Sequence, residues 1–143
     1  MNKIILASKS EVRKKILLEN GIACNVEPSK VDEDVIKESL LKEGATPEII
    51  SKNLAELKAH KISNKNPDEL VLGADSVIDL DGQIISKPTS REEAFNILKK
   101  MSGKSHFLIS SVCISKKGNM IWTYTDKAEL VMKDLNAVSY THL

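Results

Sequence analysis

A few charged side chains in this sequence could act on a phosphate group. Asp75 directly follows the apolar run Leu70–Ala74, and α/β enzymes often place a working carboxylate at the end of a buried strand. Glu33 lies in an acidic cluster and offers oxygen ligands of the kind that Mg²⁺ prefers. Lys58 and Lys87 could each reach a phosphate. Taken singly, each residue also fits a plainer interpretation: a strand-ending cap, a solvated loop or a surface lysine.

The N-terminal segment predicts a cradle for a phosphate. The apolar run Ile4–Leu6 stops at a turn that contains Ser8 and Ser10. A helix is expected to start there, with Arg13 and Lys14 in its first turns. A strand that leads into a helix N-terminus through small residues presents free backbone N–H groups and the positive end of the helix dipole. The segment therefore indicates a protein that handles nucleotides.

The elements that must position these side chains alternate in type along the chain. Apolar periodicity, caps and turn residues predict strands near 3–7, 22–26, 70–74, 83–86, 106–115 and 119–132, and helices near 10–20, 35–41, 47–63 and 91–101. The first helix is expected to bury Val12, Ile16 and Leu17, and Asp81-Gly82 predicts a hairpin turn. Hairpins mixed with single helices indicate a mixed, twisted sheet with helices packed on it.

Composition narrows the class of protein. The 143 residues suit one α/β domain, and the net charge of +1 provides no basic field for nucleic acid. Aromatic residues make up only 3% of the chain, too few for a base-stacking platform. Cys24 and Cys113 lack metal-ligand spacing and suit a reducing compartment. We find no signal peptide or membrane span in the sequence and expect a cytoplasmic protein without a membrane partner.

Several short motifs occur together and in a fixed order. They are Leu6–Ser10 with Arg13, Val31–Glu33, Leu54–Ala55 with Lys58–Ala59, Gly73–Val77, Ser86–Pro88, and Glu93–Leu98 followed by Met101–His106. In this order they resemble the motifs of the Maf family of nucleotide pyrophosphatases, from its opening LAS-x-SPRR through its GADTVV strand end. The resemblance spans residues 3–135.

The resemblance implies an inosine-triphosphatase-like α/β fold, with an elongated mixed sheet and a nucleotide cleft between two lobes. It also implies hydrolysis of nucleoside triphosphates, including non-standard ones, to monophosphate and pyrophosphate with a divalent metal, Mg²⁺ or Mn²⁺, and it allows a homodimer. By the same resemblance Asp75 accepts a proton or orients the water, and with Glu33 it holds the metal. The substrate would contact Ser8, Arg13, Lys14, Lys58, Ser76 and Lys87.

Two departures from the family motifs leave the substrate open. Glu11 and Val12 stand where the family has the Pro and first Arg of SPRR, and Ser76 replaces a Thr while keeping its hydroxyl. The sequence therefore does not choose between the thymidine/uridine type and the 7-methylguanosine type. A second interpretation also stays open, a nucleotide-binding regulator without turnover that is linked to septum formation.

The last residues differ from the rest of the chain. Val138–Leu143 match one reading frame of a common transposon sequencing adapter. We therefore expect residues 1–136 to form an incomplete Maf-like domain and residues 137–143 to be a non-native tail. A chain without the rest of its C-terminal part would lack one wall of the cleft and expose apolar surface, which could leave it inactive.

Overall fold

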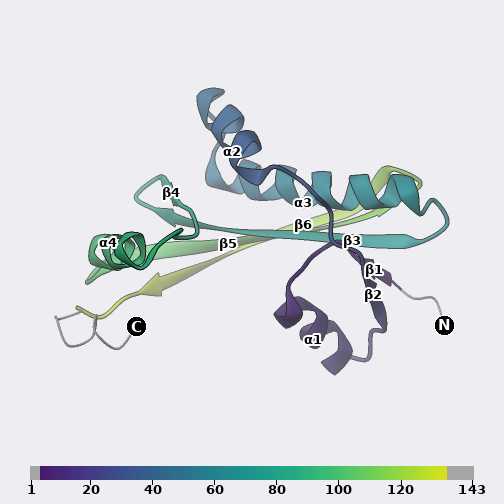
Figure 1. The fold of residues 1–143 in the computed structure, drawn as a ribbon, viewed down its shortest axis with the longest axis horizontal. Coiled ribbons are helices and arrows are strands. Elements are labelled where there is room, and N and C mark those ends of the chain that lie inside the picture. Colours follow the sequence, from purple (N-terminus) through teal and green to yellow (C-terminus); the bar gives the residue numbers. More distant parts are fainter. Residues whose placement is uncertain (1–3, 135–143) are drawn as a thin grey trace.

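The computed structural model describes residues 4–134, which form a long, twisted sheet with helices beside it (Figure 1). The strands are β1 (Ile4–Leu6), β2 (Cys24–Val26), β3 (Leu70–Leu80), β4 (Gln83–Ile85), β5 (Ser105–Lys116) and β6 (Asn119–Val131). The helices are α1 (Glu11–Glu19), α2 (Glu33–Lys42), α3 (Pro47–Lys65) and α4 (Arg91–Met101). The predicted mixed sheet flanked by helices is confirmed.

The sheet has the strand order β2-β1-β3-β5-β6, with β4 paired to the far end of β3. The pairs β2–β1 and β1–β3 are parallel, whereas β3–β4, β3–β5 and β5–β6 are antiparallel. Along one edge, β3 pairs with β1 at Leu70–Leu72 and with β4 at Ile78–Leu80. Residues 73–77 lie between these two pairings. Within the described part of the chain, that stretch of β3 has no neighbouring strand on this edge.

Helix α3 covers one face of the sheet and packs against β3 and β5 (Figure 1). Its buried residues recur at helical spacing: Ile50, Ser51, Leu54, Ala55, Ala59, Ile62 and Ser63. The helix backbone comes unusually close to β3 at Gly73, where a Cβ would lie 2.3 Å from the Ala55 carbonyl oxygen. Glycine is therefore required at this position of the strand.

Local sequence signals explain most element boundaries. Ser10, Thr46 and Ser90 each cap a helix by accepting a hydrogen bond from the backbone N–H three residues later. Asp81 and Gly82 both have positive φ, at 53° and 84°, as a two-residue type I′ turn requires. The predicted hairpin at this position is confirmed.

Two predicted boundaries are wrong. The acidic cluster that we expected to be a loop is the start of α2, because Asp32 caps the helix and Glu33 and Asp34 occupy its first turn. Carboxylates are favourable there since the helix N-terminus carries positive charge. The strand expected to end before Asp75 continues through it to Leu80, because Asp75 pairs in register with Ser111 of β5.

The expected buried face of α1 is also wrong. Val12 is 68% exposed and Ile16 is 52% exposed, and Leu17 is only half-buried. The helix makes its main packing contact with the short strand β2 and lies on the opposite side of the sheet from α3 in Figure 1. No described element covers its outward side.

Within residues 4–134, no helix combines the length and apolar character needed to cross a bilayer. The predicted tail at 137–143 lies outside the described residues.

Candidate active site

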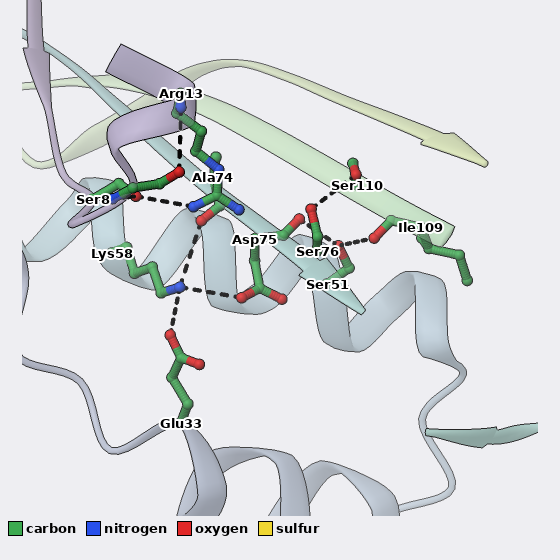
Figure 2. Close-up of polar contacts among 11 residues, drawn as sticks. Ser8, Arg13, Glu33, Ser51, Lys58, Ala74, Asp75, Ser76, Ile109 and Ser110 are labelled. Atoms are coloured by element: carbon green, nitrogen blue, oxygen red, sulfur yellow. Dashed lines mark hydrogen bonds and ion pairs between the residues drawn. The ribbon is translucent and has the colours of Figure 1, made fainter. Parts of the chain in front are cut away.

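The centre of the site is Lys58, which lies between two carboxylates (Figure 2). Its Nζ is 2.5 Å from Oε1 of Glu33 and 3.1 Å from Oδ1 of Asp75. The same ammonium donates to the Ala74 carbonyl oxygen at 3.5 Å. Lys58 is on the sheet-facing side of α3, one helical turn from Leu54 and Ile62, and its side chain is only 12% exposed. Because α3 packs on the sheet, the ammonium group of Lys58 lies beside the middle of β3.

The two carboxylates differ in electrostatic environment. Asp75 is 4% exposed, and this burial raises its pKa above the ordinary value, although the Lys58 ammonium partly offsets the effect. Partial burial also acts to raise the pKa of Glu33, but the hydrogen bond and charge of Lys58, with Lys37 and Lys87, bring it below the ordinary value. Glu33 is therefore readily ionised, whereas burial makes the ionised form of Asp75 energetically unfavourable.

Oxygen atoms at this centre are suited to a divalent cation. Oδ2 of Asp75 is buried and has no hydrogen-bond partner among the described residues, although buried polar atoms are normally paired. Across residues 4–134, no group of three or more His, Cys, Asp or Glu side chains could hold a metal unaided. Glu33 and Asp75 therefore fit an ion such as Mg²⁺ that takes one or two carboxylates and completes its shell with phosphate oxygens and water.

The predicted cradle at the start of α1 is present in the structure. Ser8 is buried, and its Oγ accepts a hydrogen bond from Nη1 of Arg13 at 2.9 Å (Figure 2). The same Oγ accepts a hydrogen bond from the Ser10 N–H at 3.2 Å. Ser10 in turn caps the helix. Both bonds use Ser8 as an acceptor, which leaves its hydroxyl hydrogen for a ligand oxygen. The hydrogen bond to Ser8 thus holds the guanidinium of Arg13 beside the turn that precedes α1.

Two adjoining cavities, of about 710 and 790 Å³, form one cleft around these groups. Their shared wall consists of Arg13, Val31, Asp32, Glu33, Lys58 and Lys87. The volumes are in the range of small-molecule sites. The cleft opens onto the unpaired stretch of β3, so a ligand there can reach both Asp75 and Ser76.

Most of the predicted site residues meet in this cleft. They are Ser8, Arg13, Glu33, Lys58, Asp75, Ser76 and Lys87. Lys14, which we also expected to hold phosphate, lines neither cavity, because it leaves α1 in a different direction from its neighbour Arg13. Ser76 places its hydroxyl 2.9 Å from that of Ser110, on the sheet face away from α3.

Sequence reasoning missed three lysines of the cleft, Lys9, Lys30 and Lys37. A usable signal existed for Lys37, which follows Glu33 by four residues and so shares its face of α2. Lys9 lies between Ser8 and Ser10 of the predicted cradle, so its position was a usable signal as well, whereas the loop position of Lys30 gave none.

Solved structures with a similar fold include a HAM1 protein. The HAM1 protein from Coxiella burnetii superposes with a TM-score of 0.57 at 14% identity, over 90% of this chain and 71% of that one. At this identity the likeness shows the fold alone. It agrees with the predicted architecture.

Sequence comparison gives the family. Residues 3–142 match the family described as Maf-like protein. A nucleoside triphosphate pyrophosphatase of Pelagibacter ubique (strain HTCC1062) is 71% identical over 94% of this chain and 69% of its own length. A 7-methyl-GTP pyrophosphatase of Brucella abortus biovar 1 (strain 9-941) is 38% identical, over 94% of this chain and 68% of its own. This chain spans about two thirds of such curated relatives, and it belongs to the Maf family.

Proposed function

We propose that this chain hydrolyses nucleoside triphosphates to nucleoside monophosphate and pyrophosphate. The observation that carries the proposal is the cation–carboxylate centre at Lys58, set in a cleft with further cations on its walls. The names of its relatives agree with this chemistry, since curated members are called nucleoside triphosphate pyrophosphatase.

In this reaction a water oxygen attacks the α-phosphorus, the bond from the α-phosphorus to the bridging oxygen breaks, and pyrophosphate leaves. Asp75 is the group best suited to orient that water and accept its proton, because burial raises its pKa above the ordinary value while it remains beside a cation. Arg13, Lys58 and Lys87 would neutralise charge on the phosphates, and Ser8 would donate to a phosphate oxygen. Ser76 would contact the sugar side of the substrate.

A divalent metal is part of the proposal. Held by Glu33 and Asp75, Mg²⁺ or Mn²⁺ would withdraw charge from the phosphate oxygens. Lys58 contacts the same two carboxylates and balances their charge in this structure. We further propose that the enzyme works in the cytoplasm.

The test is a panel of nucleoside triphosphates, including dTTP, UTP and 7-methyl-GTP, with Mg²⁺ or Mn²⁺. Released pyrophosphate and monophosphate are measured for this chain and, in parallel, for the longer Pelagibacter ubique relative. Asp75→Asn is expected to lower the rate by about 10² to 10⁴-fold. Asp79→Asn is the matched control, because Asp79 lies on the same strand but caps the hairpin through the Gly82 N–H at 2.8 Å. Tight binding of nucleotides without any turnover by either protein would support a regulator instead.

A further inference from the structure

Ser51 of α3 carries a fully buried hydroxyl that the proposed reaction does not use. Its Oγ donates to the main-chain carbonyl oxygen of Asp75 at 3.1 Å and, at 3.5 Å, to that of Ile109 (Figure 2). A serine inside a helix more commonly points to solvent or donates to the carbonyl four residues earlier in the same helix. Here the hydroxyl instead connects α3 to both β3 and β5.

Ser51 lies outside the cleft. Within residues 4–134, it is not among the side chains that line either cavity, and it approaches β3 from the face of the sheet that α3 covers. Lys58 follows Ser51 by about two helical turns, so both side chains leave the same face of α3. The helix therefore contacts Asp75 twice, at the carbonyl oxygen through Ser51 and at the carboxylate through Lys58.

The contact from Ser51 falls where β3 has the least lateral support. Within the described part of the chain, residues 73–77 have no neighbouring strand on one edge. Strand β5 pairs with this stretch on the other edge, and α3 covers one face of it. Asp75 is the middle residue of the stretch. Backbone that lacks cross-strand bonds opens more easily, so a hydrogen bond from a buried side chain to its middle residue restricts movement of the main chain there.

Resting on the proposed function, we infer that Ser51 is a positioning residue for Asp75. Its hydroxyl fixes the main chain of Asp75 relative to α3 and thereby keeps the carboxylate beside Lys58 in the cleft. Packing alone does not require this hydroxyl, because alanine occupies nearly the same volume and buries no polar group. The hydrogen bond to the strand is what the hydroxyl adds at this position.

The first test measures the main chain directly. Amide hydrogen exchange, followed by mass spectrometry of peptides, is compared for the unmodified chain and Ser51→Ala without nucleotide. Loss of one hydrogen bond is expected to speed exchange in residues 73–77 about three- to tenfold. Ser63→Ala is the matched control, because Ser63 is an equally buried serine of α3 whose Oγ accepts from the Gly118 N–H at 2.9 Å. This control is expected to speed exchange near Gly118 and to leave residues 73–77 unchanged.

The second test measures turnover of a nucleoside triphosphate. Ser51→Ala is expected to lower kcat about tenfold and to change KM less than about twofold, because the cleft keeps its contacts with the substrate while the carboxylate is less well placed. Ser63→Ala is expected to leave kcat unchanged. If Ser51→Ala does not fold, Ser51→Cys, which keeps a weaker donor of similar size, is expected to change exchange and kcat in the same directions by smaller factors.

The two tests separate this inference from the proposed function, because hydrogen exchange requires no turnover. Faster exchange in residues 73–77 of Ser51→Ala, with no pyrophosphate released by the unmodified chain, would contradict the proposed function and support the contact between Ser51 and Asp75. Unchanged exchange, an equal acceleration throughout the chain, or an unchanged kcat in folded Ser51 variants would overturn the positioning role and leave the proposed function intact.

Discussion

Gly73→Ala is the substitution that tests most sharply how the fold builds the site. The added Cβ would lie 2.3 Å from the Ala55 carbonyl oxygen and 2.7 Å from the Ala59 nitrogen. Ordinary contact begins at 3.4 Å, so α3 must retreat from β3 by about 1 Å. Lys58 is on the same turn of α3 and would move away from Asp75. A misplacement of this size costs about 10²-fold in rate.

The expected loss of stability is about 1–3 kcal/mol, the usual cost of overpacking. Backbone propensity alone predicts a gain in stability instead of a loss, because replacing Gly by Ala inside a strand normally stabilises a protein by about 0.5–1 kcal/mol. Urea unfolding followed by circular dichroism measures the stability, and pyrophosphate release measures the rate. An unchanged or increased stability together with an unchanged rate would refute the proposed packing.

Two further variants separate displacement from instability. Val71→Ala removes a fully buried side chain under the same helix without pushing it outward, so it is expected to lose stability but retain most of its rate. Adding Ala59→Gly to Gly73→Ala is expected to give no rescue, because the contacts with the Ala55 oxygen and the Ala59 nitrogen are with backbone. Full rescue would show that only the Ala59 methyl group was in the way.

Three other expectations can be checked with the same assays. Arg13→Ala should raise KM about tenfold or more through loss of a charge-assisted hydrogen bond, whereas Lys14→Ala, outside the cleft, should leave KM unchanged. Asp75→Asn should be more stable than the unmodified chain at pH 7. Because the folded-state pKa of Asp75 is raised, its ionisation costs stability above that pKa, and the advantage should disappear as the pH falls toward 3.8, the ordinary value. EDTA should abolish turnover, Mn²⁺ should restore it, and Glu33→Gln should raise the Mn²⁺ concentration needed for half of the maximal rate.

Local signals in the sequence predicted the elements, and the order of its motifs predicted the family. The hairpin at Asp81-Gly82 was predictable because few residue pairs adopt two positive φ angles. The meeting of Glu33, Lys58 and Asp75 was not predictable from spacing, because it depends on how α3 lies across β3. Only the resemblance to a family brought these residues together in advance.

The two wrong predictions about β3 and α1 also arose because tertiary contacts, and not local sequence, decide these features. Aspartate disfavours strands, yet β3 continues through Asp75 because pairing with Ser111 and the charge of Lys58 outweigh this preference. The apolar stripe of α1 suggested burial, but burial requires a second surface, and the described part of the chain does not bring one to Val12 or Ile16. Periodicity identifies a helix more reliably than it identifies what the helix packs against.

The position of the attacked phosphorus tests the central claim most directly. Hydrolysis of a preferred triphosphate in H₂¹⁸O, followed by mass spectrometry of the products, shows which phosphorus received the water oxygen. We predict one ¹⁸O in the nucleoside monophosphate and none in pyrophosphate, with the reaction lost in Asp75→Asn and retained in Asp79→Asn. Label in pyrophosphate, release of nucleoside diphosphate with inorganic phosphate, or full activity of Asp75→Asn would contradict the account.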